Sequence, residues 1–143
     1  MPITPAYAVY QPEGVYKPAT YVHAVRAGRT LYIAGQVARD AEGILVAPGD
    51  AAGQARQVYR NLGKVLEAAG AGWEHVVKIT TYLVDRADSP AVSAVRMEVF
   101  DGYMPPHTGL IVAGLGGADV RVEVDAIAVL LSWVPLEIGR AHV

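Results

Sequence analysis

The chain has 143 residues, which is enough for one domain around a single core. Hydrophobic residues make up 52% of it and charged residues 18%, and the net charge of −2 with no basic stripe argues against nucleic acid as a partner. The absence of cysteine excludes disulfides and thiolate chemistry, and no apolar run approaches the roughly 20 residues of a membrane helix, so we expect no membrane association and a cytoplasmic protein.

The first half of the chain predicts a β-hairpin followed by an amphipathic helix. Two apolar segments, 22–25 and 31–34, flank the turn RAGR. A further turn, RDAEG, leads into the short strand-like segment ILV. Beyond it, apolar residues recur every three or four positions from Asp50, a suitable N-cap, to Gly70, which predicts a helix between these two residues.

The second half predicts a strand, a helix and two more strands. The segment HVVKITTYLVD is rich in β-branched and aromatic residues, which favours a strand over 76–84. Ser89 is suited to be the N-cap of a second helix, with Pro90 as its first residue. The segments TGLIVAGL and VRVEVDAIAVLL then predict two closing strands, paired antiparallel through a short GGAD turn. Two helices can cover one face of the resulting sheet.

The face of this sheet that the helices leave uncovered should carry polar residues, but several of its positions are apolar. In GLIVAGL both alternating sets of residues are apolar, and in the last strand the face that carries Glu123 becomes apolar from Ile127 onward. Either a neighbouring subunit or a loop of the same chain covers these positions, and the interface between subunits is our preferred interpretation.

The motifs predict neither a metal nor a cofactor. The four histidines show no HxH or HExxH spacing, and no GxSxG sequence is present. The glycine-rich GLGGAD leads into a strand, not into a helix whose N-terminus could hold a phosphate, so it is interpreted as a turn. We therefore expect no metal and no cofactor.

Two candidates for chemistry remain, Glu123 in the last strand and His107 at the entrance to the strand expected to pair with it. Partial burial would raise the pKa of Glu123 toward the working pH, as general acid or base catalysis requires. The alternatives are that Glu123 pairs with Arg121 or Arg29 on a solvated face, and that His107 is an exposed loop residue.

Five segments in order resemble the Rid family, also called YjgF, of small trimeric proteins that includes enamine and imine deaminases. They are LYIAGQ, GQARQVYRNLGKVLEAAG, VVKITTYLVD, PPHTGLIVAGL and VRVEVDAIAV. The resemblance covers about residues 21–130, so we interpret 1–143 as a single Rid-like domain with short extensions. It implies a chorismate-mutase-like α+β fold, with two helices on one face of a mixed β-sheet. It also implies a homotrimer whose sheets line a central barrel and whose ligand clefts lie at the subunit interfaces.

The resemblance further implies roles for individual residues. Glu123 stands at the position of a glutamate that helps to position the hydrolytic water, Tyr21 at that of an aromatic residue lining the cleft, and Gly35 lies in the strand beside it. His107 stands where a Pro-x-Arg motif carries the arginine that grips the carboxylate of a 2-imino acid. Histidine cannot form the bidentate contact of arginine, and its charge is lost above a pKa near ~6.5, so we expect the usual small 2-imino acids to bind weakly.

The combined prediction is a homotrimer that hydrolyses a different imine or enamine. In it Glu123 orients or deprotonates water, Tyr21 orders the substrate, and backbone groups near Gly35 and Thr108 polarise it. His107 donates a hydrogen bond or a proton, or holds a carboxylate weakly when protonated. The expected partner is a small molecule that can carry a carboxylate. The alternatives are a non-catalytic ligand-binding or regulatory trimer and an endoribonuclease, which the absence of a basic stripe argues against.

Overall fold

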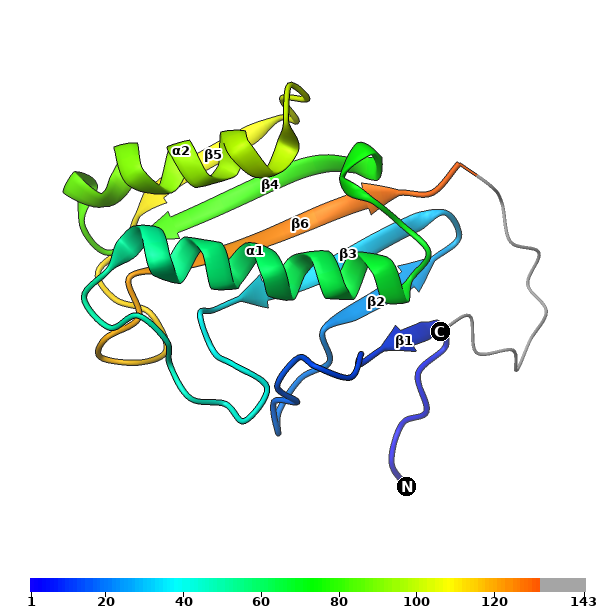
Figure 1. Ribbon diagram of the computed structural model, residues 1–143. Helices are drawn as coiled ribbons and strands as arrows, with labels where there is room; N and C mark the ends of the chain where they lie inside the picture. The colour runs from blue at the N-terminus through cyan, green and yellow to red at the C-terminus, as the bar shows by residue number, and fades with distance from the viewer. Residues whose placement is uncertain (132–143) are drawn as a thin grey trace.

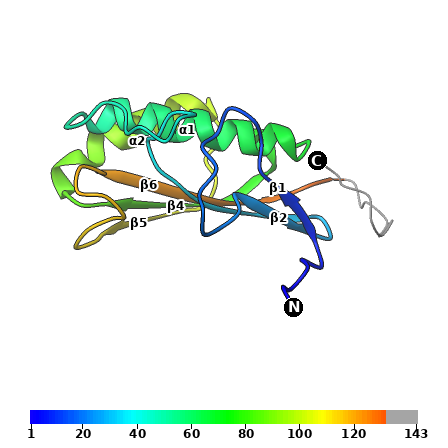
Figure 2. The same cartoon turned by 90° about the horizontal axis from the view of Figure 1, so that it is seen from below.

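The computed structural model describes residues 1–131 and shows a mixed six-stranded β-sheet with two α-helices on one face (Figures 1 and 2). The strand order is β1-β2-β3-β6-β4-β5, and every neighbouring pair is antiparallel except β4 and β5. The elements are β1 (Ala8–Tyr10), β2 (Ala24–Ala27), β3 (Thr30–Gln36), α1 (Ala51–Ala68), β4 (Val76–Leu83), α2 (Ser89–Phe100), β5 (His107–Ile111) and β6 (Val122–Val129), with 3-10 turns at Trp73–His75 and Arg86–Asp88. The predicted α+β arrangement of two helices on a mixed sheet is confirmed. Residues 132–143, beyond the segments that resemble the Rid family, lie outside the described part.

Helix α1 forms where the apolar periodicity predicts it and packs on β3 and β6. The Asp50 carboxylate accepts a hydrogen bond of 3.0 Å from the Gly53 N–H, which confirms the predicted N-cap. Gly70 follows the helix with a φ of +75°, a left-handed conformation that glycine adopts without strain. The residues buried along the helix are Ala51, Gln54, Ala55, Val58, Tyr59, Asn61, Leu62, Val65 and Leu66.

Helix α2 begins one residue earlier than predicted. Ser89 is already helical, and Asp88 occupies the N-cap position without a side-chain hydrogen bond to the helix. The carboxylate of Asp88 is engaged elsewhere, because it accepts hydrogen bonds from Nε and Nη2 of Arg121 at 2.8 and 3.0 Å. This bidentate pair ties the start of α2 to the residue before β6.

The predicted antiparallel pairing of the last two strands is wrong. β5 pairs with β4 in parallel, with Leu110 opposite Tyr82, and β6 lies between β3 and β4. The intervening helix α2 accounts for the parallel pair, because a β-α-β crossover brings the second strand back in the direction of the first. Residues 112–121 then carry the chain past β4 and do not close a hairpin, so β5 and β6 are not neighbours.

The N-terminal hairpin is confirmed, although its strands are displaced from the predicted segments. The pairing continues to Ala27 opposite Thr30, because Gly28 adopts a φ of +61° and allows a two-residue turn. The segment ILV contributes only an isolated bridge between Leu45 and Arg39, and the short strand β1 was not predicted.

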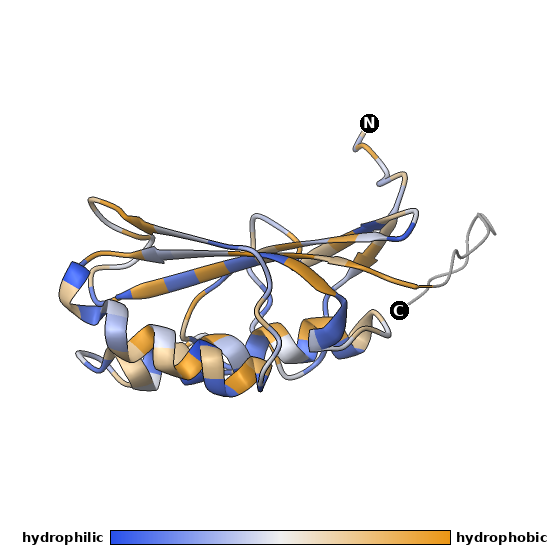
Figure 3. Cartoon of the chain, turned by 90° about the horizontal axis from the view of Figure 1, so that it is seen from above, coloured by the Kyte–Doolittle hydropathy of each residue, from blue (hydrophilic) through white to orange (hydrophobic). Residues whose placement is uncertain are grey.

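In the part of the chain that the structure describes, both helices lie on one face of the sheet and the second face carries none, as Figure 3 shows. Exposed apolar side chains on it include Tyr32 of β3, Leu110 of β5 and Val77 of β4. Within residues 1–131, no helix has both the length and the apolar character needed to cross a bilayer. This face therefore exposes apolar surface that a monomer would leave in water.

Candidate active site

A cavity of about 480 Å³ lies at the end of β3, beside the start of β6 and the loop that precedes β6. Its lining residues are Tyr21, Ala34, Gly35, Val37, Arg39, Gly116, Gly117, Val120 and Glu123. Three of the predicted site residues, Tyr21, Gly35 and Glu123, therefore share one cavity.

Glu123 reaches the cavity because of the alternation of side chains along β6. Val122 and Val124 point into the core beneath the helices, so Glu123 between them lies on the open face. Its carboxylate lies against Gly35, and a Cβ atom placed on Gly35 would overlap it. Gly35 has no left-handed φ, so the need for glycine here is one of space.

The environment of Glu123 favours its protonated form. Burial raises the pKa of this carboxyl, and the negative charge of Asp125 on the same face raises it further. Asp125 is itself held by a hydrogen bond of 2.8 Å from the Tyr82 hydroxyl. With its pKa raised in this way, the Glu123 carboxylate is a stronger base toward a water molecule than an ordinary glutamate.

The ion pairs considered as alternatives for Glu123 do not form. Arg121 binds Asp88, and Arg29 donates to the Leu131 carbonyl oxygen at 3.4 Å. Within the described residues, Glu123 has no hydrogen bond or ion pair with another side chain. Its oxygens are thus available to a ligand or to water.

Tyr21 stands at the edge of the cavity, with 47% of its surface exposed. Burial and the charge of Glu123 raise the pKa of its hydroxyl, while Arg39 acts in the opposite direction. The ring packs edge-on against His23, at 6.3 Å between ring centres. His23 is buried, and its ring nitrogens contact the Tyr16 carbonyl oxygen at 2.6 Å and the Gln36 amide at 3.1 Å, so it supports Tyr21 and does not enter the cavity.

Arg39 is a cavity residue that the sequence reasoning missed. It follows β3 in a turn, where a single arginine is indistinguishable from a solvated surface residue. Its Nη1 donates to the Gly43 carbonyl oxygen at 3.1 Å, and its Nη2 lies beside Gly117. The sequence did contain one indication that Arg39 lies near the site, because Arg39 comes only four residues after Gly35 in the chain.

His107 and Thr108 lie elsewhere, on the edge strand β5, and within one chain β4 separates them from the strand of Glu123. Nε2 of His107 contacts Nη1 of Arg96 at 2.7 Å and the Thr81 hydroxyl at 2.9 Å. Thr108 points to the opposite face, where its hydroxyl accepts a hydrogen bond of 2.5 Å from Lys78. His107 is thus a strand residue with two partners, although it remains exposed.

The surroundings of His107 work against its protonation. Burial of the ring lowers its pKa, and the positive charges of Arg96 and Lys78 lower it further. Nε2 then accepts the hydrogen bond from Arg96, which places the proton of the neutral ring on Nδ1. The protonated form, which would be needed to hold a carboxylate, is disfavoured.

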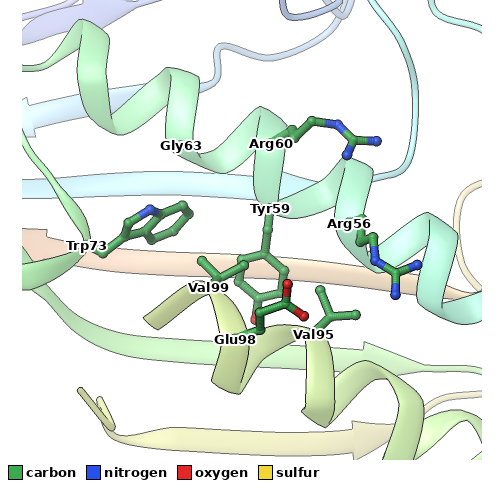
Figure 4. A pocket seen from close by; sticks show the side chains of 8 residues that line it. All are labelled: Arg56, Tyr59, Arg60, Gly63, Trp73, Val95, Glu98 and Val99. Carbon is green, nitrogen blue, oxygen red and sulfur yellow. The ribbon is translucent and has the colours of Figure 1, made fainter. Parts of the chain in front are cut away.

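A second cavity, of about 400 Å³, lies between α1 and α2 on the helical side of the sheet (Figure 4). It is lined by Arg56, Tyr59, Arg60, Gly63, Trp73, Val95, Glu98 and Val99. Burial raises the pKa of Tyr59 to about 12, so this tyrosine is not an acid or base near neutral pH. In the described part of the chain, no cluster of three or more side chains suited to a metal ion occurs.

Comparison with known proteins identifies the family. Residues 14–130 match the family model described as Endoribonuclease L-PSP. The chain belongs to this family. It is the Rid, or YjgF, family that the sequence segments resemble.

Relatives of the chain include proteins named as imine deaminases. The chain is 39% identical over 109 residues to the 2-iminobutanoate/2-iminopropanoate deaminase of Mus musculus, covering 76% of this chain and 80% of the relative. It is 40% identical over 111 residues to a RutC family protein of Synechocystis, covering 77% and 85%. Among solved structures, RidA of an Antarctic Psychrobacter aligns with a TM-score of 0.78 and 29% identity over 86% of this chain and 98% of that one. TdcF of E. coli with bound serine aligns with a TM-score of 0.77 and 27% identity over 85% and 97%.

Proposed function

We propose that this Rid protein is a deaminase that hydrolyses the C=N bond of an imine or enamine other than the usual small 2-imino acids. The observation that carries the proposal is Glu123, a half-buried carboxyl with a raised pKa and no protein partner, which faces a ligand-sized cavity. The deaminase activity of a relative at 39% identity supports the same class of reaction.

The chemistry requires a base for water and an acid for nitrogen. Glu123 takes a proton from water as the water oxygen forms a bond to the imine carbon, and the electron pair of the C=N bond moves to nitrogen, which takes up the proton held by Glu123. Glu123 then transfers the proton of the carbinolamine hydroxyl to nitrogen, and the C–N bond breaks as the C=O bond forms, which releases ammonia and leaves a carbonyl compound. No electron is gained or lost overall, so Glu123 and water suffice without a redox partner.

The other predicted residues have supporting roles. Tyr21 orders the substrate at the edge of the cavity, Gly35 leaves the space that Glu123 occupies, and backbone groups near Gly35 and Thr108 polarise the substrate. His107 donates a hydrogen bond through Nδ1. Because His107 and Glu123 lie on separated strands of one chain, they can act on one substrate only if subunits combine them.

A homotrimer with clefts at its interfaces is part of the proposal. Every residue of β5 is exposed in the single chain, and the outer edge of this strand has no partner among the described residues. An exposed, partly apolar edge strand is a hazard for aggregation that proteins normally cover. A neighbouring subunit at this edge would cover it and bring His107 to a second chain.

The test is hydrolysis of imines generated in situ, measured by competition with semicarbazide, for a series from 2-iminobutanoate to larger imines. Glu123→Gln should lower kcat roughly 10²- to 10⁴-fold, the usual contribution of a general base. Glu98→Gln, the same change on the exposed side of α2, is the matched control and should leave kcat unaltered. Wild-type protein that is folded yet never exceeds the buffer blank would refute the deaminase.

The second candidate is a trimer that binds a small ligand without turnover. The observation in its favour is that His107 has its Nε2 occupied by Arg96 and Thr81, which weakens any role as a proton donor. The bound serine in E. coli TdcF shows that a protein of similar fold holds a small ligand. Ligand-induced thermal shifts that persist in Glu123→Gln, with no turnover in the wild type, would favour this candidate.

Ribonuclease activity has less support. The family description names an endoribonuclease, but the net charge is −2 and the cavity contains one cationic side chain among its lining residues. Binding to RNA depends on several phosphate contacts with lysine or arginine. Metal-free protein, cleared of contaminating nucleases, should leave RNA intact.

A further inference from the structure

We infer that Arg39, which lies outside the Pro-x-Arg position of the family, binds a carboxylate of the substrate in this protein. The inference deepens the proposed function, on which it rests for the reaction. The binding of a carboxylate can be tested without that reaction.

The first observation is the place of Arg39 in the cavity. Arg39 is the one cationic side chain among the lining residues, and it shares the cavity with Glu123 in the same chain. No ion pair joins the two within 4.0 Å, and Arg39 has no carboxylate partner among the described residues. A guanidinium without an internal counter-charge and a carboxyl without a hydrogen bond thus face a common space large enough for a ligand.

The second observation is that the arginine is held in place. Its Nη1 donates to the Gly43 carbonyl oxygen at 3.1 Å, and its own carbonyl oxygen accepts a hydrogen bond of 2.9 Å from the buried amide of Asn61. A bridge to Leu45 fixes the backbone on the other side. Because these contacts already order the residue, a ligand loses little free energy in ordering it.

The third observation is the space beside the guanidinium. A Cβ atom on Gly117 would lie 3.2 Å from Nη2 of Arg39 and 3.1 Å from a methyl carbon of Val120, tighter than ordinary van der Waals contact. Gly117 does not adopt a left-handed φ, so space is again what glycine provides. The loop before β6 therefore leaves room for the planar face of the arginine, whose remaining N–H groups can grip a carboxylate in a bidentate manner.

Neither His107 nor Arg96, which contacts it, offers an equivalent carboxylate site in the same cavity. Nε2 of His107 is occupied by Arg96 and Thr81, and burial together with Arg96 and Lys78 keeps the ring neutral. Arg96 belongs to α2, on the opposite face of the sheet from Glu123. Among the described residues that line the cavity, Arg39 alone supplies permanent positive charge beside Glu123.

The test is calorimetric titration of the full-length protein with 2-oxobutanoate and phenylpyruvate, each compared with its uncharged methyl ester. Wild-type protein should bind at least one carboxylate more tightly than the ester. Arg39→Gln should weaken binding of that carboxylate by roughly tenfold to more than a hundredfold, the effect of losing charged hydrogen bonds, and leave binding of the ester unaltered. Arg56→Gln, an exposed arginine on α1, is the matched control for a lost positive charge. Equal binding of carboxylate and ester by the wild type would overturn the inference.

The pH dependence separates Arg39 from His107 as the carboxylate site. It is measured from pH 5.5 to 8.5 in Glu123→Gln, which removes the titration of Glu123, while Tyr21 has its pKa raised above 10 and stays protonated. Binding through Arg39 should be constant across this range, because guanidinium does not titrate there. Binding through His107 would instead weaken as pH rises, because the imidazole loses its positive charge. A decline of this kind that persists in Arg39→Gln would overturn the inference.

Kinetics distinguish failure of the inference from failure of the proposed function. For a carboxylate-bearing imine, Arg39→Gln should raise KM with a smaller effect on kcat, and Arg39→Lys should recover part of the loss. Turnover that needs Glu123 but is equal in wild type and Arg39→Gln would retain the deaminase and reject the carboxylate site. Carboxylate binding that needs Arg39, with no turnover of any imine, would retain the site and reject the deaminase.

Discussion

At the scale of single residues, the close approach of Gly35 and Glu123 limits where the carboxylate of Glu123 can lie. A Cβ atom at residue 35 would overlap that carboxylate, so Gly35→Ala must displace it. We expect the displacement to lower kcat at least tenfold, because misplacement of a catalytic group by about 1 Å can cost on the order of 10²-fold. Steady-state kinetics on the best imine substrate measure the change.

The matched control for this variant is Gly114→Ala. A Cβ atom on Gly114 meets nothing within 4 Å, and its φ is not left-handed, so activity and stability should remain those of the wild type. If Gly35→Ala were as active as Gly114→Ala, the position of Glu123 against β3 would not matter to the reaction.

Glu123 also carries a cost in stability that depends on pH. Its pKa is raised in the folded state, chiefly by burial, so the folded protein binds this proton more tightly than the unfolded chain does. The cost is absent below the ordinary pKa of glutamate, grows as pH rises from that value toward the raised pKa, and is complete above the raised pKa. Glu123→Gln should therefore have a higher Tm than wild type at pH 8, and the difference should disappear near pH 4. If Glu123→Gln and the wild type had the same Tm at pH 8 as well as at pH 4, burial would not destabilise the carboxylate.

At the scale of elements, helix α1 controls the loop that forms one wall of the cavity. Gln54, fully buried on this helix, donates to the Asp119 carbonyl oxygen at 2.9 Å and accepts from the Arg121 N–H at 2.9 Å. These two bonds flank Val120, which lines the cavity. Gln54→Leu should lower the free energy of unfolding by about 1–3 kcal/mol, because it leaves buried backbone groups without partners.

Urea denaturation measures this loss, and Gln57→Leu on the same helix is the matched substitution. Among the described residues, the Gln57 side chain bonds only to Asn61 and Arg60 of its own helix, so its replacement should cost clearly less. Similar losses in the two variants would mean that the bonds to the loop contribute little. A specific loss in Gln54→Leu should be accompanied by weaker carboxylate binding, since the loop also carries Gly117 beside Arg39.

The elements that could be predicted from the sequence are those specified by local patterns. Helix α1 follows from its apolar spacing and from Asp50, and β4 follows from its run of β-branched residues. The neighbours of β5 and β6 could not be predicted in this way, because both alternating sets of residues in GLIVAGL are apolar and the crossover through α2 decides which strands are adjacent. The N-cap of α2 was misplaced because the partner of Asp88 is Arg121, 33 residues away.

The residues of the candidate site also fall into two groups, those that the sequence predicts and one that it does not. The segments around Tyr21, Gly35 and Glu123 could be recognised, and the structure brings these three residues into one cavity. Arg39 was missed because its role depends on Gly43 and Gly117, which only the fold places beside it.

At the scale of the whole molecule, the two helices cover one face of the sheet, and within residues 1–131 no helix covers the other. The helices bury the β6 residues that alternate with Glu123, while Tyr32 and Leu110 on the open face have 53% and 43% of their surfaces exposed. Exposed apolar surface next to an unpaired edge strand is typical of an oligomer interface. Because His107 and Glu123 are separated in one chain, assembly and activity should depend on each other.

Leu110→Glu tests this link between assembly and activity. The charge would be placed on β5 beside Tyr82 and would be buried without a partner if a subunit packs there, which is strongly unfavourable. We expect light scattering to show a shift from a trimer toward the 15.1 kDa monomer, together with a loss of imine turnover. Met97→Glu, an exposed apolar residue on the outer side of α2, is the matched control and should remain trimeric and active. A Leu110→Glu protein that kept the wild-type mass would place the interface away from β5. A monomer with full turnover would show that Glu123 and Arg39 suffice within one chain and that His107 takes no part in the reaction.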